Sequence, residues 1–120
     1  MDYTTQMDAA RKGIVTPQMK IVAEKEHMPV EKLMALVASG KVAIPANKVH
    51  TSLSPEAVGQ DCRTKINVNL GVSPEHNNHE EELQKVQNAI DMKAEAIMDL
   101  SNFGKTREFR RKLVKMSTAM

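Results

Sequence analysis

The stretch RTKINVNLG, residues 63–71, alternates apolar and polar side chains. Side chains along a β-strand point to opposite faces with a period of two, so the alternation predicts a strand with one apolar and one polar face. The apolar face carries Ile66, Val68 and Leu70, and the polar face carries Lys65, Asn67 and Asn69. A strand with one face in water gives the same alternation, so the flanking residues must show which kind of sheet it joins.

The segments that follow favour a parallel sheet. Residues 71–74, Gly-Val-Ser-Pro, end the strand, and residues 78–94 read as a helix. Residues 96–100 then read as a second strand and residues 106–116 as another helix. This order predicts an α/β fold in which a right-handed crossover joins two parallel strands.

Polar residues at the two strand ends are the first candidates for a binding site. In parallel α/β folds the ligand lies at the carboxyl ends of the strands, which are Asn69 and residues 98–101 here. Asparagine is a poor strand former, and its amide needs up to four hydrogen-bond partners. Asn67 and Asn69 together therefore indicate a ligand or a polar lumen, with a plain solvent-facing strand as the alternative. Asp99 points away from the Met98 face, where a carboxylate would cap a helix or fix a loop.

Both helices after the strands have a clear apolar side. In residues 78–94 the apolar stripe is Leu83, Val86 and Ile90, with Glu80, Glu81, Glu82 and Lys85 on the wetter side. Residues 105–115 are the most basic stretch, which contacts with phosphates would explain. A solvated helix face with Phe109, Leu113 and Met116 turned inward explains it better.

Three short helices are predicted ahead of the strand. The first covers residues 4–12, capped by a threonine and stopped by glycine. The second begins at Pro17 with Thr16 as its N-cap, since proline at the first helical position loses no hydrogen bond. The third covers residues 30–39 and ends at Gly40.

A connector joins these helices to the strand. Residues 41–44 read as a brief strand, residues 54–56 as a single helical turn, and Gly59 as a helix stop. The sequence therefore predicts two domains, a small helical one over residues 1–60 and a β/α one over residues 61–120.

Composition narrows the classes of protein and partner. The chain has 120 residues, 17 basic and 15 acidic, so its net charge of +2 calls for no nucleic-acid or membrane partner. Cys62 is the single cysteine, which rules out an internal disulfide and a cysteine-held cluster within this chain. With neither an apolar run of about 18 residues nor a secretory signal, a cytoplasmic location is expected.

Other candidate chemistry is weak. His76 and His79 are three residues apart, as two metal ligands on one helix face would be, but two ligands do not complete a site and the segment reads as a polar lead-in to a helix. The sequence contains no glycine-rich phosphate loop and no nucleophile with a recognisable base. No catalytic or metal-ligating residue is predicted.

Four motifs in order resemble the phosphomethylpyrimidine synthase (ThiC) family. They are residues 5–16 (TQMDAARKGIVT), 42–47 (VAIPAN), 63–71 (RTKINVNLG) and 96–101 (AIMDLS). The resemblance implies a radical S-adenosylmethionine lyase that converts 5-aminoimidazole ribonucleotide into hydroxymethylpyrimidine phosphate in thiamin biosynthesis. It also implies an amino-terminal domain, a (β/α)8 TIM-type barrel, a 4Fe-4S cluster held by a Cys-x-x-Cys-x-x-x-x-Cys motif, and a zinc-like divalent metal.

On this resemblance the chain is the amino-terminal piece of such an enzyme. It would comprise the small helical domain and the opening βαβα of an incomplete barrel, with the cluster cysteines and metal ligands beyond residue 120. The fragment alone is then expected to be inactive, to bind no cluster, S-adenosylmethionine or metal, and to form a homo-oligomer through its open strand edges.

The resemblance also assigns two site residues. Asn69 matches the family's substrate-binding asparagine, and Met98 matches its substrate-contacting methionine. Residues 102–104, Asn-Phe-Gly, depart from the Thr-Gly of many members. Two alternatives stay open: the related 5-hydroxybenzimidazole synthases of anaerobic cobamide biosynthesis, which use the same substrate, and a non-catalytic stand-alone interaction module.

Overall fold

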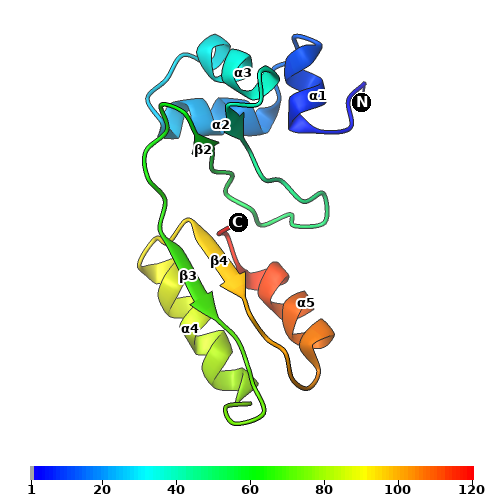
Figure 1. Ribbon diagram of the computed structural model, residues 1–120, viewed down its shortest axis with the longest axis vertical. Coiled ribbons are helices and arrows are strands. Elements are labelled where there is room, and N and C mark those ends of the chain that lie inside the picture. The colour runs from blue at the N-terminus through cyan, green and yellow to red at the C-terminus, as the bar shows by residue number, and fades with distance from the viewer. Residues whose placement is uncertain (1) are drawn as a thin grey trace. The chain divides into compact units, whose positions relative to one another are not determined.

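A computed structural model describes residues 2–120 and shows an α/β chain with two small sheets. The chain divides into two compact units (Figure 1). The first unit contains the residues up to 47 together with 55–64, and the second contains residues 48–54 and 65–120. No helix within residues 2–120 is long and apolar enough to cross a membrane.

Three helices form most of the first unit, namely α1 (Gln6–Arg11), α2 (Pro17–Lys25) and α3 (Val30–Ala38). The predicted threonine caps of α1 and α2 are confirmed, although α1 begins at Gln6 and not at residue 4. The Thr16 side chain accepts a hydrogen bond from Met19 N at 3.1 Å, and Thr5 caps α1 in the same way. Gly40 follows α3 with a positive φ of 77°, which the predicted helix end requires.

A two-residue ladder completes this unit and corrects one prediction. Strand β1 (Val42–Ala43) pairs antiparallel with β2 (Val58–Gly59), so Gly59 lies in a strand and does not stop a helix. The predicted helical turn at residues 54–56 is wrong, because these residues have no regular structure. Glu56 is buried there and receives Lys25 Nζ at 2.6 Å, so a contact with α2 outweighs the local turn preference.

The second unit has the predicted strand, helix, strand, helix order: β3 (Asn67–Leu70), α4 (His79–Asp91), β4 (Ala96–Asp99) and α5 (Thr106–Met116). Strands β3 and β4 pair in parallel, which confirms the predicted parallel sheet. Only residues 67–70 of the stretch 63–71 are paired as a strand. Ile66, which was predicted to share the apolar face of the strand, therefore lies outside it and is 62% exposed.

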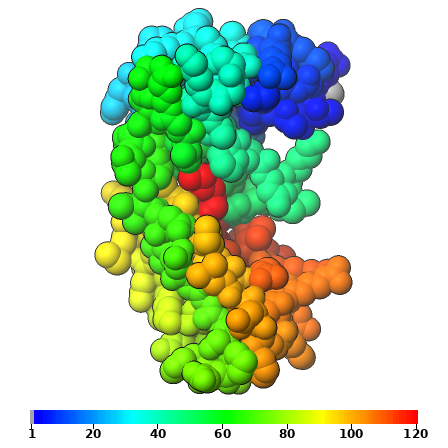
Figure 2. Space-filling model, in the orientation of Figure 1, coloured from blue at the N-terminus to red at the C-terminus, as the bar shows by residue number. Residues whose placement is uncertain are grey.

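Both helices pack on one face of this sheet. Leu70, Val86 and Phe109 form the buried centre, and around them lie Leu83, Ile90, Ile97, Leu113 and Met116. The predicted inward side of α5 is thus confirmed. The other face carries Asn67, Asn69, Ala96 and Met98, because side chains alternate along each strand. In Figure 2 the green of β3 and the orange of β4 both reach the surface of this unit.

The last residues continue the sheet along the far edge of β4. Ile97 N donates to Met120 O at 2.9 Å, and Met120 N donates to Glu95 O at 3.0 Å, the bonding pattern of a parallel pair. Ser52 Oγ holds the residues between α5 and this segment by donating to Ser117 O at 2.7 Å. The edge of β4 that sequence reasoning left open is therefore covered at its start.

Candidate functional site

The candidate site lies on the helix-free face at the carboxyl ends of β3 and β4. The strand register pairs Asn69 directly with Met98, so the two residues assigned from the family motifs are cross-strand neighbours. Met98 is 51% exposed. Asn67 Nδ2 donates to Asn69 Oδ1 at 2.7 Å, which orients the Asn69 amide. Within residues 2–120 no group accepts a hydrogen bond from Asn69 Nδ2, so this donor is available to a ligand. Substrate binding by Asn69 and Met98 stays a prediction.

The loops after the two strands pair with each other beyond the sheet. Leu100 N donates to Leu70 O at 2.7 Å and Asn102 N donates to Val72 O at 3.0 Å. The buried Ser101 side chain accepts from Val72 N at 3.0 Å. These bonds fix the backbone that immediately follows Asn69 and Met98.

Asp99 holds the second loop from the helix-bearing side. Its Oδ1 accepts from Ser101 N at 2.9 Å and its Oδ2 accepts from Arg110 Nε on α5 at 2.6 Å. Burial alone would raise the pKa of this carboxyl, but the hydrogen bonds from Ser101 and Arg110 outweigh burial and hold the pKa below its ordinary value of 3.8. The loop-fixing role predicted for Asp99 is confirmed, and Arg110 is the partner that sequence reasoning missed.

We expect Asp99→Asn to lower the free energy of unfolding at pH 6 by about 1.5–3 kcal/mol, the usual contribution of a hydrogen bond to a charged group. Because the folded-state pKa is depressed, this stabilisation is present above pH 3.8 and is lost as the pH falls through the folded-state value. Urea unfolding at pH 6 and at pH 3 measures this pH dependence. The difference in the free energy of unfolding between wild type and Asp99→Asn should shrink at pH 3, and a constant difference would contradict the role of the charge. Asp91→Asn, at the exposed end of α4, is the control.

The histidine pair does not come together as a ligand set. The His79 ring lies 5.4 Å from the Phe109 ring, tilted by 38°, so His79 packs against the core of the unit. Among the residues that the structure describes, the His, Cys, Asp and Glu side chains form no group of three that could hold a metal.

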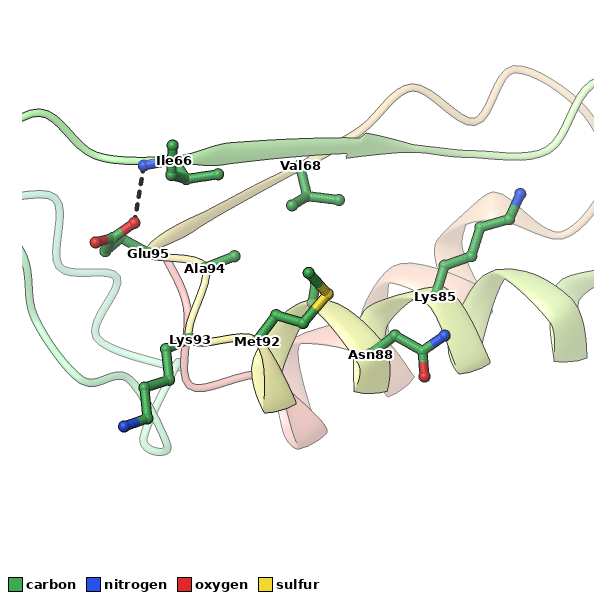
Figure 3. A pocket seen from close by; sticks show the side chains of 9 residues that line it. Ile66, Val68, Lys85, Asn88, Met92, Lys93, Ala94 and Glu95 are labelled. Atoms are coloured by element: carbon green, nitrogen blue, oxygen red, sulfur yellow. Dashed lines mark hydrogen bonds between the residues drawn. The ribbon is translucent and has the colours of Figure 1, made fainter.

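An apolar groove of about 400 Å³ lies between β3 and α4 (Figure 3). Met92 reaches from the end of α4 toward Ile66 and Val68, and Glu95 Oε2 accepts from Ile66 N at 2.8 Å. The rest of the lining is Lys85, Asn88, Ala89, Lys93 and Ala94. The groove lies along the outer edge of β3, on the side of the sheet that carries α4, and the Asn69 side chain points to the opposite face. Most of its exposed lining is apolar, so the groove offers few polar contacts to a ligand.

Comparison with known proteins agrees with the motifs. A model of the radical SAM ThiC family matches residues 5–120. The chain belongs to this family. Phosphomethylpyrimidine synthases of Clostridium novyi (strain NT) and of Clostridium botulinum (strains Hall and Langeland) are each 68% identical over all 120 residues. The chain spans 28% of the length of these relatives.

Membership of the ThiC family implies S-adenosylmethionine and an iron–sulfur cluster in the longer proteins, and the residues of this chain do not fit that cluster. A 4Fe-4S cluster takes several thiolates, whereas the sequence has Cys62 alone. Cys62 is partly buried and packs against the core of the first unit. The residues of this chain therefore cannot hold the cluster by themselves.

Proposed function

We propose that this chain supplies the amino-terminal domain and the first two β/α units of a (β/α)8 barrel in a phosphomethylpyrimidine synthase. The longer enzyme would be a radical SAM lyase that converts 5-aminoimidazole ribonucleotide into hydroxymethylpyrimidine phosphate for thiamin biosynthesis. The observation that carries the proposal is the pairing of Asn69 with Met98 on an exposed face at the strand ends. The 68% identity to relatives of that name supports the same reaction.

Each site residue would contribute a distinct contact. The Asn69 amide, with its oxygen already bonded to Asn67, presents its N–H donors to a polar group of the ribonucleotide. Met98 offers a polarizable apolar surface beside it, suited to a heterocyclic ring. The 4Fe-4S cluster, S-adenosylmethionine and a zinc-like metal would be held by the rest of the longer protein.

The function is tested in a chimera, in which this chain replaces the matching 28% of the Clostridium novyi relative. After anaerobic reconstitution with iron, sulfide and S-adenosylmethionine, the chimera should convert 5-aminoimidazole ribonucleotide into hydroxymethylpyrimidine phosphate, identified by mass spectrometry. Formation of 5-hydroxybenzimidazole would support the alternative synthase. No turnover beside an active Clostridium enzyme would favour the non-catalytic module.

For the 120-residue chain alone we expect self-association. In β3 the carbonyl groups of Ile66 and Leu70 face β4, so the backbone groups of Asn67 and Asn69 face the open edge. Met92, 83% exposed, and Ile66 border the groove beside that edge. A second copy can pair with the edge and cover this apolar surface.

Light scattering across a dilution series measures this association. The chain should exceed monomer mass at micromolar concentration and dissociate on dilution. Ile66→Lys, which places a charge in the groove, should weaken the association, whereas Ile21→Lys on α2 should not. A folded monomer at every concentration would contradict self-association through the open edge of β3.

A further inference from the structure

Glu82 on α4 is a buried carboxylate in a position where the helix pattern favours an apolar residue. Its exposed fraction is 4%, and it shares the buried side of the helix with Val86 and Ala89, which follow it at spacings of four and then three. The prediction that Glu82 faces water is therefore wrong. Burial of a carboxylate is costly unless hydrogen bonds satisfy it, so its contacts should show why it is there.

Both Glu82 oxygens have partners. Oε2 accepts from Gly71 N at 2.8 Å, and Oε1 lies 2.5 Å from Lys85 Nζ, one turn along the same helix. The contact with Lys85 compensates the buried charge, whereas the contact with Gly71 ties α4 to the backbone two residues after Asn69.

The bond to Gly71 lies on the opposite side of the strand from β4. Leu70 O and Val72 O both accept bonds from the β4 side, at 2.7 Å and 3.0 Å. Because backbone groups alternate along an extended chain, the Gly71 N–H points to the open edge. Glu82 satisfies that donor where a neighbouring strand would otherwise supply a carbonyl oxygen.

The backbone after Asn69 is thus held from two sides. Ser101 Oγ accepts from Val72 N on the β4 side, and Glu82 accepts from Gly71 N on the other. A glycine is required between these bonds, since a Cβ at Gly71 would lie 2.5 Å from Ser101 N. The position of the Asn69 amide depends on the backbone that this pair of bonds fixes.

We propose that Glu82 is a positioning residue for the ribonucleotide site, acting through Gly71 on the strand end that carries Asn69. This inference rests on the function proposed above. Glu82 does not contact the ligand. It fixes the backbone, so the Asn69 amide is already in position when the ribonucleotide binds.

The test uses the chimera described above, with Glu82→Leu, Glu82→Gln and the control Glu80→Leu, an exposed residue in the first turn of the same helix. Titration calorimetry measures the affinity for 5-aminoimidazole ribonucleotide. Glu82→Leu leaves the Gly71 N–H without an acceptor and should weaken binding about tenfold. Glu82→Gln keeps an acceptor oxygen and should stay within about threefold of wild type. Glu80→Leu should bind as wild type does.

Hydrogen exchange at residues 71–72, measured by mass spectrometry on the same proteins, reports on the contact itself. Exchange should accelerate in Glu82→Leu and stay slow in Glu82→Gln. A general loss of packing would not be restored by the acceptor oxygen of glutamine. Wild-type affinity in Glu82→Leu, despite faster exchange, would overturn the positioning role and leave the proposed function intact. Failure of the unsubstituted chimera to bind the ribonucleotide would overturn the proposed function, and this inference with it.

Discussion

Phe109→Ala should lower the free energy of unfolding of the second unit by about 3–5 kcal/mol, the usual cost of emptying a large aromatic site in a core. Phe109 is 1% exposed, the largest fully buried side chain of the described residues, and it joins α5 to Leu70 and Val86. It also contacts the His79 ring at the start of α4. With so few other apolar side chains in this core, the cavity has little to collapse onto. Urea unfolding followed by circular dichroism measures the loss.

The chain offers a matched control, because its only other phenylalanine is exposed. Phe103 is 42% exposed in the loop after β4, and Phe103→Ala should change stability by no more than about 0.5 kcal/mol. Equal effects of the two substitutions would contradict the assignment of the core.

Gly71→Ala should lower the free energy of unfolding by more than about 3 kcal/mol, since it combines backbone strain with a backbone clash. The φ of Gly71 is +147°, a conformation that side-chain-bearing residues rarely adopt. A Cβ there would lie 2.5 Å from Ser101 N and 2.7 Å from Leu100 C, both backbone atoms that cannot swing aside. The pairing of the two loops must therefore open. Hydrogen exchange of the Leu100 and Asn102 amides should accelerate together with the loss of stability.

Gly13→Ala separates strain from clash. Gly13 has a φ of +71°, and a Cβ added there would meet no atom within 4 Å, so alanine should cost only about 1 kcal/mol. If Gly71→Ala were as mild as Gly13→Ala, the close approach of the two loops would be refuted.

Local signals explain why much of the fold could be predicted. Threonine followed by proline at residues 16–17 satisfies the first N–H groups of a helix wherever the chain lies, so α2 begins as predicted. The strand, helix, strand order favours a parallel pair, because a helix between two strands provides the crossover that parallel pairing needs. These features depend on near neighbours in the sequence.

The features that the sequence missed depend on distant partners. Residues 54–56 carry a local turn signal, but the buried pairing of Glu56 with Lys25 decides their conformation. Glu82 resembles the acidic residues beside it, and only the approach of Gly71 explains its burial. Its spacing from Val86 and Ala89 was the available signal, because it places a charge on the buried side of the helix.

The candidate site rests on two different signals in the sequence. Family motifs assigned Asn69 and Met98, while the alternation of side chains put Asn69 on a polar face. That the two residues are direct neighbours follows from the strand register. Sequence alone does not determine this register, because a shift of two residues would keep the same faces.

Binding of 5-aminoimidazole ribonucleotide by the Asn69→Ala chimera tests most directly whether this strand end is the ligand site. Alanine removes the amide that would pair with the ligand, so binding should weaken by about 1–3 kcal/mol, or about 5- to 150-fold in Kd. Asn88→Ala, on the exposed side of α4, is the control and should bind as wild type does. Titration calorimetry should show the loss for Asn69→Ala only, and equal affinity of wild type and Asn69→Ala would contradict the assignment of the site.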